Sequence, residues 1–137
     1  IGVGVDPSGA NALAIEWAMA RAQRLAARVR LVAGIEDGGI ARLFGRRMTP
    51  EQREAALVDA HDKVAALAAP AMDKYDDVDV LISVHDGEPV PVLLKVSKEV
   101  DLLIIGTGQK ILGFGVGGVV RGLMAHAHCP LGIVRHR

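Results

Sequence analysis

The sequence predicts an α/β fold in which an open parallel sheet is covered by helices on both faces. Short apolar runs that suit buried strands alternate along the chain with Ala-rich or amphipathic segments that suit helices. The segments between successive runs are long enough for the crossover helices that parallel strands require. The predicted order is β-α-β-α-β-α-β-α-β. No internal repeat or linker divides residues 1–137, so we expect one domain.

The first strand and helix are predicted at residues 1–5 and 11–27. The strand ends at a turn-forming segment that begins with Asp6. Ser8 or Asn11 could cap the helix, because their side-chain oxygens accept backbone N–H groups. One helical row holds Leu13, Trp17, Ala20 and Arg24.

A second strand is predicted at residues 29–35 and a second helix from residue 50 to about residue 75. Thr49 and Pro50 form a typical helix start, with acid in the first turn. Pro70 should kink or end this helix near Ala69. The apolar row of the helix is Leu57, Ala60, Val64, Leu67 and Ala68.

The second half is predicted to contain three more strands and two shorter helices. The strands are expected at residues 78–84, 101–105 and 130–134, and the helices at residues 89–99 and 118–126. The helix at residues 89–99 has Val92, Leu93 and Val96 on one face.

Composition excludes several classes of partner. The 16 basic residues balance 16 acidic ones, so we expect neither nucleic acid nor an anionic membrane surface as a partner. No apolar run approaches the roughly 20 residues of a membrane span. Cys129 is the one cysteine of the chain, which fits a reducing compartment, and we expect a cytoplasmic protein. The chain opens with the apolar run at Ile1 rather than with Met or a signal peptide, which leaves open an origin in a larger protein.

A glycine-rich segment between a predicted strand and a predicted helix is the strongest functional signal. Six glycines lie between Gly106 and Gly118. Glycine lets backbone N–H groups approach an anion closely, and a helix N-terminus adds donors and a positive dipole end. The segment therefore predicts a phosphate loop, and a surface loop without a ligand is the alternative. It is neither a Walker loop nor a dinucleotide fingerprint, which would follow the first strand.

Asp6 would share the same crevice, because ligands of open parallel sheets bind beyond the carboxyl ends of the strands. Its carboxylate could accept hydrogen bonds from a ribose or a base, or it could simply cap the first helix. A phospho-acceptor receiver domain would need a second acidic neighbour and a late lysine, which the sequence does not supply.

Other chemistry is weakly supported by the sequence. His126, His128 and Cys129 cluster near the end of the last predicted helix, but zinc needs three or four organised ligands, so no metal site is predicted. Cys129 is interpreted as a small buried apolar residue. No serine or cysteine lies in an elbow-like setting, so no catalytic residue is predicted.

The last strand suggests a partner. An apolar edge strand tends to pair with another chain, so residues Leu131 to Val134 predict a homodimer. A monomer whose edge is guarded by Arg135, His136 and Arg137 is the alternative.

Four segments together resemble the universal stress protein family, over essentially the whole chain. They are Gly2-Val3-Gly4-Val5-Asp6, Gly87-Glu88-Pro89, Asp101-Leu102-Leu103-Ile104-Ile105-Gly106-Thr107 and Ala125-His126-Ala127-His128-Cys129-Pro130. The resemblance implies the adenine nucleotide alpha hydrolase-like fold with strand order 3-2-1-4-5, dimers through the fifth strand, and a cytoplasmic stress-response or regulatory role. It also implies ATP or another adenine nucleotide as ligand.

The family pattern assigns this ligand to particular residues. In the nucleotide-binding subgroup the loop reads Gly-x2-Gly-x9-Gly-Ser/Thr, and here Gln109 replaces the second glycine, Gly118 replaces the hydroxyl residue, and the loop is two residues shorter. These departures favour altered binding, weaker for ATP or shifted to a smaller adenine nucleotide. The residues that the resemblance assigns to nucleotide binding are Val5, Asp6, Gly34, Gly106, Thr107, Gly108, Gly117, Gly118 and Val119.

The leading hypothesis is a homodimeric regulatory domain that binds an adenine nucleotide and has at most weak ATP hydrolysis. A second hypothesis is a nucleotide-free dimerisation or partner-docking domain with an unknown protein partner. Its origin in a larger protein such as a transporter or kinase is left open. A nucleotide-hydrolysing or nucleotidyl-transferring enzyme ranks last, because no general base can be named beside the loop.

Overall fold

The computed structural model describes residues 1–7, 12–35, 48–107 and 118–135. In these ranges five parallel strands form one sheet in the order β3-β2-β1-β4-β5. The strands are β1 (Gly2–Gly4), β2 (Val29–Ile35), β3 (Val80–Asp86), β4 (Leu103–Thr107) and β5 (Leu131–Arg135). The predicted fold class and the strand order that the family resemblance implied are therefore confirmed.

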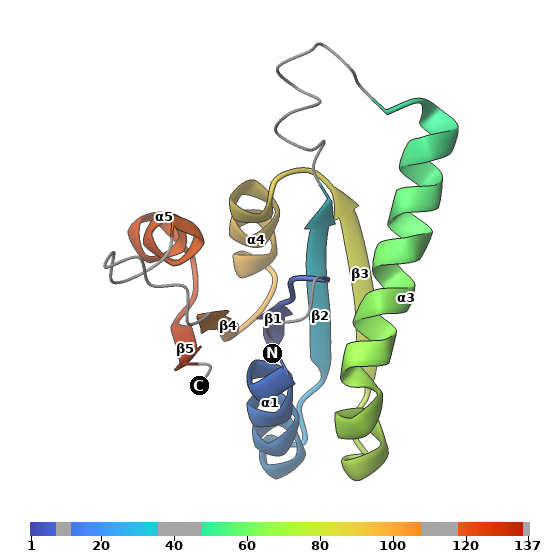
Figure 1. Cartoon of the computed structure of the whole chain (residues 1–137). Helices are drawn as coiled ribbons and strands as arrows, with labels where there is room; N and C mark the ends of the chain where they lie inside the picture. The colour runs from blue at the N-terminus through green and yellow to red at the C-terminus, as the bar shows by residue number, and fades with distance from the viewer. Residues whose placement is uncertain (8–11, 36–47, 108–117, 136–137) are drawn as a thin grey trace.

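Four helices of the described chain cover the sheet in two layers (Figure 1). They are α1 (Ala12–Leu25), α3 (Pro50–Lys74), α4 (Pro89–Ser97) and α5 (Gly118–His126). One apolar cluster joins α1 and α3 to one face of the sheet, and a second joins α4 and α5 to the other. Their buried residues are almost all aliphatic, in keeping with the 3% aromatic content of the chain.

Helix α1 buries a different row from the one that the sequence marked. Leu13 and Trp17 are each 43% exposed, and the buried residues are Ala14, Ile15, Ala18, Met19 and Ala22. Small side chains on this row let the helix lie close to the sheet, where dispersion contacts are most numerous. The row of Leu13, Trp17, Ala20 and Arg24 is thus the outer face of α1.

Helix α3 starts as predicted but does not end at Pro70. The Thr49 hydroxyl accepts a hydrogen bond from Gln52 N at 3.1 Å, and the Gln52 side chain accepts one from Thr49 N at 3.0 Å. The helix continues beyond Pro70 to Lys74, which confirms the predicted end near residue 75, whereas the alternative of an end near Ala69 is wrong. Pro70 lies on the exposed face, where water can donate a hydrogen bond to the carbonyl oxygen that lacks a backbone donor. Ala68 and Ala71 stay buried on the core side.

The remaining boundaries differ from the predictions by a few residues. Strand β3 begins two residues later than predicted and reaches Asp86, and β4 runs through Gly106 and Thr107. Helix α4 ends at Ser97, whose buried hydroxyl donates to Leu94 O at 2.6 Å and accepts from His128 N at 3.1 Å. Among the described residues, no helix is both long and apolar enough to cross a membrane.

Ala26, just after α1, has a left-handed backbone with φ of 50°. The Ala27 N–H donates to Ala22 O at 2.9 Å, which is the hydrogen bond of a Schellman cap. We expect Ala26→Gly to stabilise the fold by about 0.5–1 kcal/mol, because glycine adopts this conformation without the steric cost. The measurement is the free energy of unfolding in urea.

The matched control is Ala66→Gly, at an exposed site inside α3. There glycine should destabilise by about 1 kcal/mol. If both variants lower the stability equally, the left-handed residue carries no strain.

Candidate functional site

The carboxyl ends of the strands form the edge of the sheet where the predicted site residues gather. Strand β1 pairs with β2 on one side and β4 on the other, with Gly4 opposite Val32 and Ile105. The chain winds from β1 to β2 and β3, and then crosses to β4 on the far side of β1. The winding direction therefore switches between β1 and β4, which is where ligands of such sheets bind.

The residues that follow β1 and the end of β4 belong to the same edge of the sheet. The N–H of Val5 donates to Val32 O at 2.8 Å, so this residue extends the sheet beyond Gly4. The Val5 side chain is 6% exposed and belongs to the cluster under α1, which leaves mainly its backbone for contact with a ligand. Asp6 is exposed at the edge. The pairing of β1 with β4 ends at Gly4 and Ile105, and β4 continues beyond it at this edge with Gly106 and Thr107.

The predicted loop from Gly106 to Gly118 begins later than the sequence indicated. Gly106 and Thr107 are strand residues that pair with Val134 and Arg135 of β5. The strand prediction for residues 101–105 was early by two residues, because Leu103, not Asp101, starts the buried part of the run. Gly108 and Gly117, together with Gln109, lie outside the described residues.

Helices α4 and α5 cover the same face of the sheet and both begin at this edge, and they differ in the backbone donors that they offer. Helix α5 starts at Gly118, Val119 and Val120, each of which has an N–H group, and Val119 is 36% exposed. Helix α4 starts with Pro89 and Pro91, which have none. Unpaired N–H groups in the first turn are what a helix offers to an anion. Of the two helices, α5 is the better suited to bind phosphate.

Gly34, at the end of β2, is covered by the turn between β3 and α4. A Cβ atom at this position would lie 2.6 Å from Gly87 O, closer than real Cβ atoms approach. The turn is fixed by Gly87 N, which donates to Ile35 O at 2.9 Å, and Gly87 has φ of +154°. The side-chain side of Gly34 is thus filled by protein backbone.

Two charged pairs that the sequence did not single out lie at opposite ends of the sheet, one at this edge and one at the amino ends of the strands. Arg53 of α3 binds the Asp86 carboxylate at the end of β3, and Arg30 of β2 binds Glu99 after α4. The hydrogen bond from Arg30 lowers the pKa of Glu99 below its usual value. The paired residues are 33 and 69 positions apart. No local pattern could have revealed them.

The cysteine and histidines of the predicted cluster lie apart from this edge. Cys129 is half-buried against the cluster under α4 and α5, and burial raises the pKa of its thiol. His126 and His128 are exposed. In the described part of the chain, no three side chains of metal-binding types come together.

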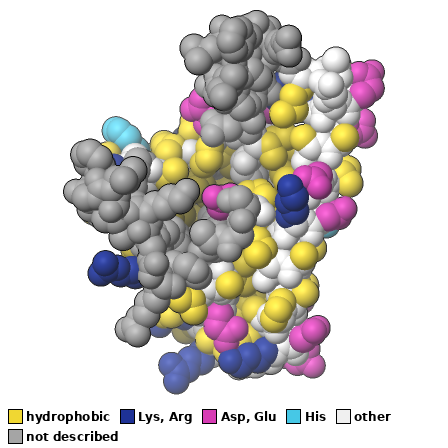
Figure 2. Space-filling view, viewed as in Figure 1, with side chains coloured by type: hydrophobic (Ala, Val, Ile, Leu, Met, Phe, Trp, Pro, Cys, Tyr) yellow, Lys and Arg dark blue, Asp and Glu magenta, His cyan; other side chains and the backbone are white. Residues whose placement is uncertain are grey.

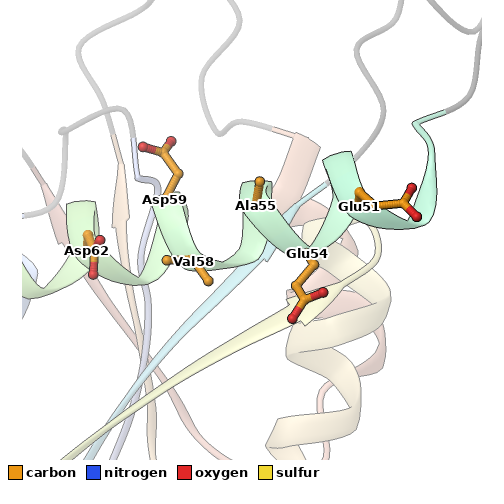
Figure 3. Close-up of a pocket in the computed structure, with 6 residues that line it drawn as sticks. All are labelled: Glu51, Glu54, Ala55, Val58, Asp59 and Asp62. Atoms are coloured by element: carbon orange, nitrogen blue, oxygen red, sulfur yellow. The ribbon is translucent and has the colours of Figure 1, made fainter.

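A pocket of about 520 Å³ lies along α3, and Figure 3 shows the side chains that line it. All six come from this one helix: Glu51, Glu54, Ala55, Val58, Asp59 and Asp62. Four carboxylates would repel a phosphate. The pocket is therefore a poor nucleotide site, and it contains none of the predicted site residues. Elsewhere on this view of the surface, acidic and basic side chains are interspersed, in keeping with the zero net charge (Figure 2).

We expect Gly34→Ala to cost about 1–3 kcal/mol of stability, because the new methyl group meets backbone that cannot rotate away. The measurement is the free energy of unfolding in urea. Gly2→Ala is the control, since its Cβ would meet the Leu103 Cδ1 atom at 3.2 Å, the end of a side chain that can move. An equal loss in both variants would contradict the role assigned to the turn over Gly34.

Comparisons with known proteins agree with this geometry. The model of the Universal stress protein family matches residues 1–135. A universal stress protein of Mycobacterium tuberculosis is 28% identical over 147 aligned residues, which cover 96% of this chain and 46% of the relative. The chain therefore spans less than half the length of this curated relative.

Solved structures of universal stress proteins share the fold. One, crystallised in complex with cAMP, superposes with a TM-score of 0.62 and 21% identity, over 99% of this chain and 95% of its own. Another, from Archaeoglobus fulgidus in complex with dAMP, gives a TM-score of 0.59 and 18% identity, over 97% and 94% of the two chains.

Proposed function

The chain belongs to the universal stress protein family, and we propose that it is a cytoplasmic regulatory domain that binds an adenine nucleotide at the carboxyl edge of its sheet. The observation that carries this proposal is the position of the switch point between β1 and β4. Asp6, the end of β4 and the first turn of α5 all belong to this edge. The complexes of two structural relatives with cAMP and dAMP support an adenine nucleotide as the ligand class.

Each part of the proposed site has a chemical role. The carboxylate of Asp6 accepts hydrogen bonds from the ribose hydroxyls or the adenine amino group. Gly106, Thr107 and Gly108 let the phosphate approach the backbone, and the N–H groups of α5 complete the anion site. Gly118 and Val119 open that helix, and Gly117 directly precedes it in the sequence.

The missing hydroxyl at Gly118 and the shortened loop favour a nucleotide with few phosphates. A lost hydroxyl contact costs about 1 kcal/mol. We therefore propose that AMP or a cyclic nucleotide binds at least as well as ATP. The domain acts by binding rather than by turnover, in the stress response that gives the family its name.

Asp6→Ala should weaken nucleotide binding at least about tenfold, since a hydrogen bond to a charged group contributes roughly 1.5–3 kcal/mol. Titration calorimetry with ATP, ADP, AMP and cAMP measures the dissociation constants. Asp79→Ala is the control, because this exposed carboxylate precedes β3 at the opposite end of the sheet. If no nucleotide binds even at millimolar concentration, the proposal fails and a partner-docking domain takes its place.

We further propose that the protein is a homodimer whose two copies pair through β5. This strand is one of the two edges of the sheet, and Ile133 is 45% exposed on it. An unprotected apolar edge has unpaired backbone groups that a second strand can satisfy. An antiparallel pair across a two-fold axis would satisfy both copies at once.

Ile133→Lys should shift the protein toward the monomer in sedimentation velocity, because two lysines would approach one another across the axis. Leu81→Lys is the matched control, since Leu81 is 61% exposed on the other edge strand, β3. If Leu81→Lys dissociates the dimer and Ile133→Lys does not, the interface is formed by β3 and not by β5.

A further inference from the structure

The outer face of α1 carries a row of side chains spaced four residues apart, which we call the α1 row: Leu13, Trp17, Arg21 and Leu25. Residues at this spacing are neighbours on a helix surface. Leu13 and Trp17 are each 43% exposed and Leu25 is 60% exposed. The Arg21 guanidinium lies 5.5 Å from the centre of the Trp17 ring. Three large apolar side chains thus share one stripe that nothing in the described chain covers.

The hydrogen bonds of α1 show which way this row faces. Glu16 accepts from Lys74 Nζ at 2.6 Å and from Tyr75 Oη at 3.1 Å, both at the end of α3. Gln23 donates to Asp77 at 2.9 Å, just beyond that helix. Arg21 is two residues from Gln23, which is about 200° of helix rotation. The α1 row is therefore on the flank of the helix that faces away from α3.

That flank faces the β5 edge of the sheet. Helix α3 packs on β2 and β3, whereas α1 also packs on β4 and β5. In Figure 1, α1 lies between α3 and the end of the sheet that β5 forms. The Val134 side chain of β5 packs against the cluster that contains the buried row of α1. The α1 row and the open edge of β5 therefore adjoin one another on one side of the molecule.

The α1 row and the open edge of β5 match in length. The strand edge alone, however, is too small for a stable dimer. From residue 13 to residue 25 the helix rises about 18 Å, and five strand residues span about 17 Å. A strand edge of that length and about 10 Å of sheet thickness offers under about 200 Å². Stable interfaces bury roughly 800 Å² on each partner. A second copy paired through β5 needs further contact surface beside the strand.

We infer that the α1 row supplies this surface and that its occupant is a second copy of this chain. The inference rests on the proposed pairing through β5. A two-fold axis through antiparallel β5 strands brings the α1 helices of both copies to the same face of the joined sheet, one on each side of the axis. In this dimer each copy buries the exposed surface of its Leu13, Trp17 and Leu25 side chains against the other copy. Aromatic residues of this kind are typical anchors of interfaces.

Trp17 is the one tryptophan of the sequence, so its fluorescence reports on the α1 row directly. We expect its emission to move to shorter wavelength as the wild-type protein is concentrated through the range in which sedimentation velocity shows dimer formation. In the double variant Leu13→Asp, Leu25→Asp, the dimer dissociation constant should rise at least about tenfold, as for the loss of interface anchors. The protein concentration at which the Trp17 emission shifts should rise by the same factor.

Leu81→Asp is the control for an equally exposed leucine on the opposite edge, and it should leave the dissociation constant unchanged. Far-ultraviolet circular dichroism checks that each variant is folded. The inference is overturned, and pairing through β5 stands, if the wild-type protein dimerises without a shift of its Trp17 emission and the double variant keeps the wild-type dissociation constant. A chain that stays monomeric at every concentration overturns both.

Discussion

The three-residue strand β1 is hydrogen-bonded along both edges, to β2 and β4, and the layers of this protein are arranged around it. Its side chains divide between the two faces of the sheet. Val3 and Val5 enter the cluster under α1, whereas Gly4 faces α4, where a Cβ atom would lie 3.1 Å from Leu93 Cδ1. The alternation of valine and glycine therefore lets α4 lie directly on the central strand, and a larger side chain there would push this helix away.

The same strand determines where the function is expected. Because β2 and β4 flank β1, the chain reverses its winding direction beside β1. Asp6 and Thr107 therefore belong to the same edge of the sheet. Because α4 starts with prolines, α5 is the better suited of these two helices to bind an anion. The topology thus explains why one edge of the sheet, rather than the pocket along α3, is the proposed site.

Where sequence-based predictions departed from the structure, packing decided the outcome. Pro70 removes one hydrogen bond from α3, but it does so on the exposed face, so the buried alanines on either side hold the helix together. The sequence marked the row of α1 with Leu13 and Trp17, but the structure buries the adjoining row. That row contains Ile15 and Met19 together with three alanines, whose small side chains let the helix lie close to the sheet. This choice left Trp17 on the surface beside β5.

The sequence by itself determined the alternation of strands and helices, the cap at Thr49 and the family, because these depend on local patterns and short segments. The strand order followed from the resemblance, and the structure agrees with it. Of the site, the sequence could mark Asp6 and the glycine-rich segment, whose role as ligands of a nucleotide stays a prediction. Only the tertiary structure decided that Gly34 is covered by the turn at Gly87, that Arg53 pairs with Asp86, and which row of α1 is buried. These depend on side chains and backbone distant in sequence, whose meeting is set by how the layers pack.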